Sequence, residues 1–106
     1  MPRPFRRYEL LLPTSFNDGA QVPDNLIGET VLEIRRQFGA VSSETQSIEG
    51  NWEHEGRVYR DLSVRLFVDD PDTPENQQFF IELKERLKER FQQIDIWMTT
   101  YPLEVI

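Results

Sequence analysis

The chain has 106 residues, 38% of them hydrophobic and 29% charged, with seven Phe, two Trp and three Tyr. This length and composition predict one globular domain, residues 1–106, rather than a disordered chain or several domains. The absence of cysteine excludes disulfides, thiol nucleophiles and thiolate metal sites, and the formal charge of −7 disfavours anionic partners.

A basic cluster lies in the first seven residues, at Arg3, Arg6 and Arg7, and leaves 9 basic and 19 acidic side chains in the remainder. A body this acidic repels phosphate backbones and anionic lipid, so we expect neither a nucleic-acid nor a membrane partner. The cluster either contacts an anion or an acidic partner or, as is commoner, only adds solubilising charge. The nearby apolar run of about five residues is too short for a signal sequence or a membrane span, so we expect a cytoplasmic location.

The stretch FRRYELLL predicts the first strand, because Tyr8, Leu10 and Leu12 recur at every second position. Pro13 ends this strand, and the following TSFNDGAQVP is typical of a loop. Residues 24–39 then predict a helix of about four turns. Its buried stripe is expected to contain Ile27, Val31, Ile34 and Phe38, and Gly39 occupies the place of a left-handed C-cap.

Residues 40–52 and 57–70 predict two further strands. The second of them has the clearest alternation in the chain, so its even-numbered residues from Val58 to Val68 are expected in the core. Val41 and Ile48 have opposite parity in the first of them. Either one of these two side chains is exposed, or the strand contains a bulge.

The connection between these two strands predicts a hairpin around His54, Glu55 and Gly56. A two-residue loop at Glu55 and Gly56 sets the register and places Trp52 opposite Tyr59 as a cross-strand aromatic pair. The same register pairs Ile48 with Ser63 and Gln46 with Arg65.

The stretch DDPDTPEN ends the third strand and begins a second helix. Thr73 is the expected N-cap, Pro74 the first helical residue, and Glu75 a favourable charge at the positive end of the helix dipole. An exposed ion pair is expected between Glu82 and Arg86. The buried stripe of this helix is expected to contain Phe80, Leu83, Leu87 and Phe91.

The last predicted strand is IDIWMTTY, with Ile94, Ile96 and Met98 on its core face and Pro102 limiting its continuation. The resulting order β-α-β-β-α-β predicts an α+β, ferredoxin-like sandwich, in which two helices cover one face of a four-stranded antiparallel sheet. The first and third strands are expected to be central. The other sheet face has no helix to cover it.

This uncovered face combines aromatic and charged side chains. Our candidate interface or ligand residues on it are Arg7, Glu9, Trp52, Tyr59, Asp61, Arg65, Phe67, Trp97 and Tyr101. Large exposed apolar patches usually mark an interface or a binding groove. An oligomer interface is therefore favoured over a small-ligand pocket, and a plain solvated sheet face is the third alternative.

Glu53, His54 and Glu55 form the segment that most resembles a reaction centre, and His54 is the only histidine. Neighbouring side chains on a strand point to opposite faces, so His54 shares no site with its flanking glutamates unless the tip is irregular. One histidine is a poor zinc donor set, and a solvated tip does not exclude water as a general base requires. We expect a surface turn without metal or cofactor, and keep His54 as a secondary site candidate.

Other known motifs do not match the sequence. An EF-hand loop that starts at Asp70 needs glycine and glutamate where this chain has Glu75 and Ile81. The third strand, VYRDLSVRLFV, lacks the glycine and aromatic pattern of an RNA-recognition domain. No phosphate loop or nucleophile motif is present in the sequence.

Three segments, YELLLPTSFNDGAQVP, FGAVSSETQSIEGNWEHEGRVYRD and RFQQIDIWMTTYPLEVI, together resemble a small family of uncharacterised bacterial proteins over nearly the whole chain. This resemblance implies no activity and no site residue. The architecture is also similar to the dimeric α/β-barrel group, whose members pair their sheets face to face, and some of which are cofactor-free enzymes. That similarity implies a dimer but transfers no catalytic residue.

We therefore predict a non-enzymatic domain that self-associates as a homodimer, or binds another protein, through its aromatic uncovered face. The alternative is a small cofactor-independent enzyme or ligand binder whose pocket uses Arg65, Asp61, Arg7 and Tyr59 as polar contacts. A filled interface would favour the first function, and an enclosed cavity beside these side chains would favour the second.

Overall fold

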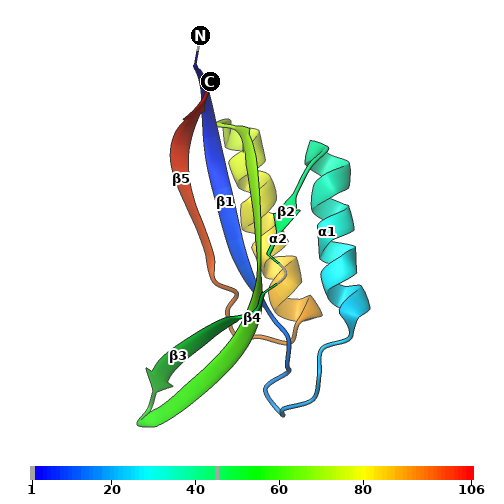
Figure 1. The fold of residues 1–106 in the computed structure, drawn as a ribbon, viewed down its shortest axis with the longest axis vertical. Coiled ribbons are helices and arrows are strands. Elements are labelled where there is room, and N and C mark those ends of the chain that lie inside the picture. Colours follow the sequence, from blue (N-terminus) through cyan, green and yellow to red (C-terminus); the bar gives the residue numbers. More distant parts are fainter. Residues whose placement is uncertain (1, 45) are drawn as a thin grey trace.

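The computed structural model describes residues 2–44 and 46–106. Its elements are, in chain order, β1 (Arg3–Pro13), α1 (Asp24–Phe38), β2 (Ser42–Ser43), β3 (Ile48–His54), β4 (Arg57–Pro71), α2 (Pro74–Arg90) and β5 (Met98–Val105). In these ranges, two helices lie on one face of a five-stranded antiparallel sheet (Figure 1). Neither of the described helices is long and apolar enough to cross a membrane.

The central strands of the sheet are β1 and β4, as their alternation predicts. The order is β2-β4-β1-β5, and β3 pairs with the part of β4 that extends beyond β1. The first and last strands, β1 and β5, are antiparallel neighbours, so the two ends of the chain lie close together at one end of the molecule (Figure 1).

The sheet has five strands instead of the expected four because the predicted second strand is interrupted. Ser42 lies opposite Phe67, whereas Ile48 lies opposite Ser63, so the pairing with β4 shifts by two residues between β2 and β3. The expected pairing of Gln46 with Arg65 is therefore wrong, and the amide of Glu44 donates to the Arg65 carbonyl instead, at 2.9 Å. A shift of two preserves the side-chain alternation, and Val41 and Ile48 are both half-buried.

The core lies between the helices and the even-numbered residues of β1 and β4. Its buried members are Tyr8, Leu10, Leu12, Val22, Ile34, Leu66, Val68, Phe80, Leu83, Leu87, Phe91 and Ile96. The predicted stripe of α2 is thus fully buried. In α1 only the Ile34 member of the predicted stripe is fully buried, while the other three are half-buried against the core.

The predicted core face of the third strand is wrong at its beginning. Val58 is 70% exposed, and Arg60 and Leu62 are exposed as well, whereas Leu66 and Val68 are buried. The reason is geometrical, because β3 and the first half of β4 project past the ends of the helices (Figure 1). We call this projecting hairpin, residues 48–63, the arm.

The last strand begins later than predicted and runs further. Ile94 is exposed in the turn after α2, and β5 starts at Met98 and continues through Pro102. Proline is tolerated there because β5 is at the edge of the sheet, where one side of the strand needs no hydrogen-bonded partner.

The helix ends follow the sequence signals. Gly39 adopts the left-handed conformation with φ 86°, and its amide donates to the Arg35 carbonyl at 2.7 Å. The Thr73 hydroxyl accepts from the Asn76 amide at 3.1 Å and caps α2.

The predicted pair of Glu82 with Arg86 is wrong. Arg86 bonds to Glu33 of α1 at 2.7 Å, and Glu82 accepts a hydrogen bond from Gln78. A partner on the facing helix has displaced the local one, because the two helices lie side by side (Figure 1).

Candidate interface on the open sheet face

The sheet side opposite the helices, which we call the open face, collects all nine predicted residues. Arg7 lies opposite Asp69 and Tyr101, and Glu9 lies opposite Phe67, so these side chains share one side of the sheet. Trp97 joins this side because its carbonyl accepts from the Leu11 amide at 3.0 Å, which continues the β1–β5 pairing. The residues fall into two groups, one on the body of the sheet and one on the arm.

The group on the body is built around Phe67. The guanidinium carbons of Arg7 and Arg65 lie 4.7 and 4.5 Å from the centroid of its ring. Guanidinium groups at these distances are attracted by the negative face of an aromatic ring. Phe67 therefore orients both arginines along the sheet surface.

Arg7 is held by a two-bond ion pair with Asp69. Its Nε–H and NH2 donate to the two carboxylate oxygens at 2.7 and 2.9 Å, the fork geometry that makes arginine–carboxylate pairs specific. These hydrogen bonds raise the pKa of Arg7 and hold the pKa of Asp69 below its ordinary value. Both side chains are therefore charged at neutral pH.

Arg65 bridges two carboxylates. It donates to Glu9 at 2.6 Å and to Glu44 at 2.6 Å, and the Tyr101 hydroxyl adds a bond to Glu9 at 3.2 Å. The hydrogen bonds from Arg65 lower the pKa of Glu9 despite its partial burial. The charges on the body of the sheet are thus paired with one another along the face.

The sequence reasoning missed two members of this group. Asp69 lies two residues after Phe67, so the alternation of β4 already placed it on the open face. Glu44 has the parity of the open face as well, but the expected register placed Gln46 opposite Arg65, so Glu44 was not assigned to this arginine.

The group on the arm consists of Trp52, Tyr59 and Asp61, with Arg57 beside them. Trp52 and Tyr59 are cross-strand partners, as predicted, and their rings stack with centroids 4.3 Å apart. The indole N–H of Trp52 donates to Asp61, and the Arg57 guanidinium lies 5.4 Å from the Tyr59 ring. The indole N–H of Trp52 is thus satisfied locally, while its side chain remains about half exposed.

His54 lies at the tip of the arm and is exposed, as expected for a surface turn. Glu55 and Gly56 have positive φ values of 51° and 78°, the signature of the two-residue turn that the register requires. This irregular backbone brings His54 Nε2 to 3.7 Å from Glu55, but both side chains are in water. Across residues 2–44 and 46–106, no group of three or more acidic or histidine side chains is arranged to hold a metal ion.

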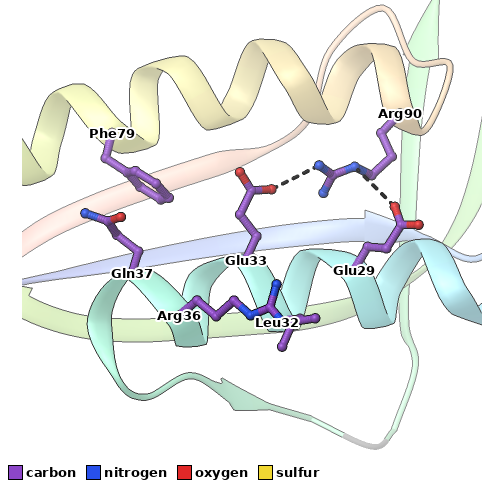
Figure 2. Close-up of a pocket in the computed structure, with 7 residues that line it drawn as sticks. All are labelled: Glu29, Leu32, Glu33, Arg36, Gln37, Phe79 and Arg90. Atoms are coloured by element: carbon purple, nitrogen blue, oxygen red, sulfur yellow. Dashed lines mark hydrogen bonds and ion pairs between the residues drawn. The ribbon is translucent and has the colours of Figure 1, made fainter.

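A groove of about 480 Å³ lies on the other side of the molecule, between α1 and α2 (Figure 2). It is lined by Glu29, Leu32, Glu33, Arg36, Gln37, Phe79 and Arg90. Arg90 donates to Glu33 at 2.9 Å and approaches Glu29 at 4.0 Å, so these charges tie the helices together. The sequence reasoning did not anticipate this groove, because it depends on how the two helices meet.

No model of a protein family matches this chain, and no curated protein matches it. The solved structures that share its fold include the following three. A phage SAM lyase in complex with S-methyl-5′-thioadenosine has a TM-score of 0.69 and 13% identity, covering 95% of this chain and 88% of that one. CutA1 from Oryza sativa has a TM-score of 0.63 and 17% identity, covering 99% and 84%. The phage SAM lyase in its apo state has a TM-score of 0.61 and 15% identity, covering 98% and 89%.

These similarities establish a small α+β fold and nothing about activity, since unrelated functions share such folds. The expected resemblance to a bacterial family stays a prediction.

Proposed function

We propose that this chain is a non-enzymatic, ferredoxin-like domain that self-associates through its open face and its arm. The observation that supports this most is the exposed aromatic surface of Trp52, Trp97 and Tyr101, of which Trp97 is 67% exposed. Aromatic side chains of this kind are enriched in the centres of protein interfaces and gain most from being covered.

The paired charges on the open face support the same proposal. Covering a charge that has no partner is costly, whereas a charge with a hydrogen-bonded partner can be covered at a much smaller cost. Arg7 already has Asp69, and Arg65 already has Glu9 and Glu44. The face can therefore be covered by a second copy of the chain without leaving these charges unpaired.

The arm supports it from another side. A two-stranded hairpin alone is marginally stable in water, and this one exposes Trp52 on one side and Val58 and Leu62 on the other. A second copy of the chain that packs on the arm would cover these exposed side chains and supply the packing that the helices do not give. Two-fold pairing is the simplest arrangement, because it places the same surface on both sides of the contact.

The test is the molar mass in solution by light scattering coupled to size exclusion, over a range of micromolar concentrations. We expect an oligomer for the wild type and a shift towards monomer for Trp97→Asp. The matched control is Ile94→Asp, which also places a charge on an exposed apolar residue, but in the turn after α2. A wild type that stays monomeric, or equal effects of both variants, would contradict the proposal.

A second candidate function is a ligand site between two open faces. It is supported by the two arginines, Arg7 and Arg65, over the ring of Phe67 and by the Tyr101 hydroxyl at Glu9, which offer charge, a stacking surface and a hydroxyl on one face. The phage SAM lyase of similar fold was solved with S-methyl-5′-thioadenosine, so that compound is a suitable first probe. Calorimetric titration that shows binding to the wild type, and loss of binding in Arg65→Gln, would favour this candidate. An absence of heat in both would leave self-association as the proposal.

A further inference from the structure

A buried carboxylate lies at the end of the sheet where β4 leads into α2. Asp70 faces the helix side and is 4% exposed, and within the described residues its Oδ2 atom finds no hydrogen-bond partner. The hydroxyl of Tyr8, a buried residue on the neighbouring strand, likewise has no hydrogen-bond partner among the described residues. Buried polar atoms are nearly always bonded, so a pair of exceptions on one face requires an explanation.

The nearest cation in the strand register is Arg6. Its Cα atom is the direct partner of Asp70 in the β1–β4 pairing, and directly opposite residues project to the same side of a sheet. Arg6 nevertheless donates from Nε to Asp72 at 3.0 Å, and from NH1 to the Thr100 hydroxyl at 3.5 Å. The Arg6 guanidinium is therefore bonded to Asp72, although its backbone is paired with that of Asp70.

Asp72 occupies the connection that leads into α2. Its amide donates to the Pro4 carbonyl at 3.2 Å, and the next residue is Thr73, which caps the helix. The bond from Arg6 to Asp72 thus fastens the start of α2 to β1. A change of partner by Arg6 would loosen this attachment.

We propose that Arg6 is an ion-pair switch that bonds Asp72 while Asp70 is protonated and moves to Asp70 when that carboxyl ionises. The movement removes the side-chain bond between β1 and the start of α2 and leaves the backbone bond from Asp72 to Pro4, so the attachment at this end of the molecule becomes weaker as the pH rises. This inference is independent of the proposed self-association, because Asp70 faces the helices and the contact surface is on the open face.

While Arg6 is bonded to Asp72, the surroundings of Asp70 favour the protonated form of its carboxyl. Burial is the main cause, and the charge of Asp69 adds to it, raising the pKa of Asp70 to about 6. Burial also raises the pKa of Tyr8, which keeps its hydroxyl neutral. The charged and titratable groups around this end are Arg6 and Tyr8 on β1, Asp69 and Asp72 beside Asp70, Glu75 in the first turn of α2, Glu104 on β5, and Arg35 and Arg36 in the last turn of α1.

The chemistry of the exchange is balanced without any added group. At low pH the neutral Asp70 carboxyl needs no cation, and Arg6 neutralises Asp72. Loss of the proton to solvent creates a buried anion, and an opposite charge within a few Å lowers the pKa of such a group by about 1 to 3 units. Arg6 gains more from the buried anion than from the more exposed Asp72, whose charge water can solvate.

The experiment is an NMR titration of the full chain from about pH 2 to about pH 8, a range that brackets the ordinary aspartate value of about 3.9. It follows the Asp70 carboxyl carbon and the Arg6 Nε–H signal. We expect Asp70 to titrate above the ordinary aspartate value and the Arg6 signal to move with the same midpoint. A normal midpoint for Asp70, or an Arg6 signal that does not respond, would overturn the switch.

Two variants sharpen the test because they push the midpoint in opposite directions. Arg6→Gln removes the incoming cation, so the Asp70 midpoint should rise. Asp72→Asn frees Arg6 for Asp70, so the midpoint should fall, with a separation of about one pH unit or more between the two variants. Equal midpoints in both variants would mean that Arg6 never reaches Asp70, and the proposal would be wrong.

Discussion

The rings of Trp52 and Tyr59 stack 4.3 Å apart with an interplanar angle of 14°, on a part of the sheet that projects beyond the helices. With no core beneath it, the arm depends on cross-strand contacts of this kind for its local stability. The pair also presents the exposed side of Trp52 to any surface that covers the arm. The assembly that we propose through the arm would thus use the same two side chains that stabilise it.

The first prediction concerns the coupling of these two rings. A double-mutant cycle with Trp52→Ala and Tyr59→Ala should give a coupling free energy of about 0.5 to 1.5 kcal/mol in urea unfolding, as for other aromatic pairs. The control cycle uses Glu53→Ala and Val58→Ala, which are also cross-strand partners but form no stacked pair. Equal coupling in both cycles would show that the stacking contributes nothing specific.

The second prediction concerns the aromatic centre of the core. Phe80 stacks on Tyr8 at 3.9 Å and on Phe38 at 5.2 Å, and it is 1% exposed. Phe80→Ala should lower the free energy of unfolding by about 3 to 5 kcal/mol, because it leaves a cavity that these rings cannot fill. The next residue, Ile81, is exposed on the same helix, and Ile81→Ala should change stability by less than about 1 kcal/mol.

The features that could be predicted from the sequence are those that depend on neighbouring residues. The turn at Glu55 and Gly56 fixes the register of the arm, and once the register is known Trp52 must lie opposite Tyr59. The stripe of α2 and the Thr73 cap are similarly local. Each of these predictions used spacings of a few residues, and each is confirmed.

The features that could not be predicted depend on how far one element reaches over another. Val58 and Leu62 alternate like core residues, but the helices end before they can cover them. Arg86 has Glu82 within its own helix, yet it bonds Glu33 on the facing helix. On the open face, parity found nine candidates, while the two-residue shift in the pairing with β4 brought Glu44 to Arg65 in place of the expected Gln46.

The third prediction tests the cap of α2. Thr73→Ala removes the hydroxyl that accepts from the Asn76 amide and should cost about 1 kcal/mol of unfolding free energy. Thr73→Ser keeps that oxygen and should restore most of the loss. Thermal unfolding of both variants beside the wild type measures the difference. A serine variant as unstable as the alanine variant would assign the effect to the threonine methyl group instead.

The fourth prediction concerns the charge that joins the two helices. Glu33 accepts hydrogen bonds from Arg86 at 2.7 Å and from Arg90 at 2.9 Å. Burial opposes its ionisation, but these hydrogen bonds outweigh burial and hold the pKa of Glu33 below its ordinary value. Because the folded pKa is the lower one, the stabilisation is present at neutral pH and is lost as the pH falls through that value.

Glu33→Gln should therefore destabilise the protein at neutral pH by about 1 to 3 kcal/mol and have little effect in acid. Urea unfolding at both pH values measures this. Glu29 is the control, since it lies one turn earlier on α1 and only approaches Arg90 at 4.0 Å. A loss in Glu29→Gln as large as that in Glu33→Gln would contradict a specific role for the Glu33 bonds.

The fifth prediction is that removing the charge of Asp70 stabilises the protein at neutral pH, whereas removing that of Glu33 destabilises it. Burial raises the pKa of this carboxyl in the folded state to about 6, above its value in the unfolded chain. The folded state thus holds the proton more tightly, so the wild type should lose stability as the pH rises through about 4 to 6 and change little above that range. Asp70→Asn does not titrate, and should equal the wild type in acid and exceed it at neutral pH.

The gain at neutral pH should be about 2 kcal/mol, since each unit of pKa difference corresponds to about 1.4 kcal/mol and pairing with Arg6 recovers a part of it. Asp69→Asn is the matched control, because the neighbouring carboxyl faces the other side and is held by Arg7 with a lowered pKa. That variant should lose stability at neutral pH where Asp70→Asn gains it. If urea unfolding gives both variants the same sign of change, the burial of Asp70 does not govern its ionisation, and the raised pKa is wrong.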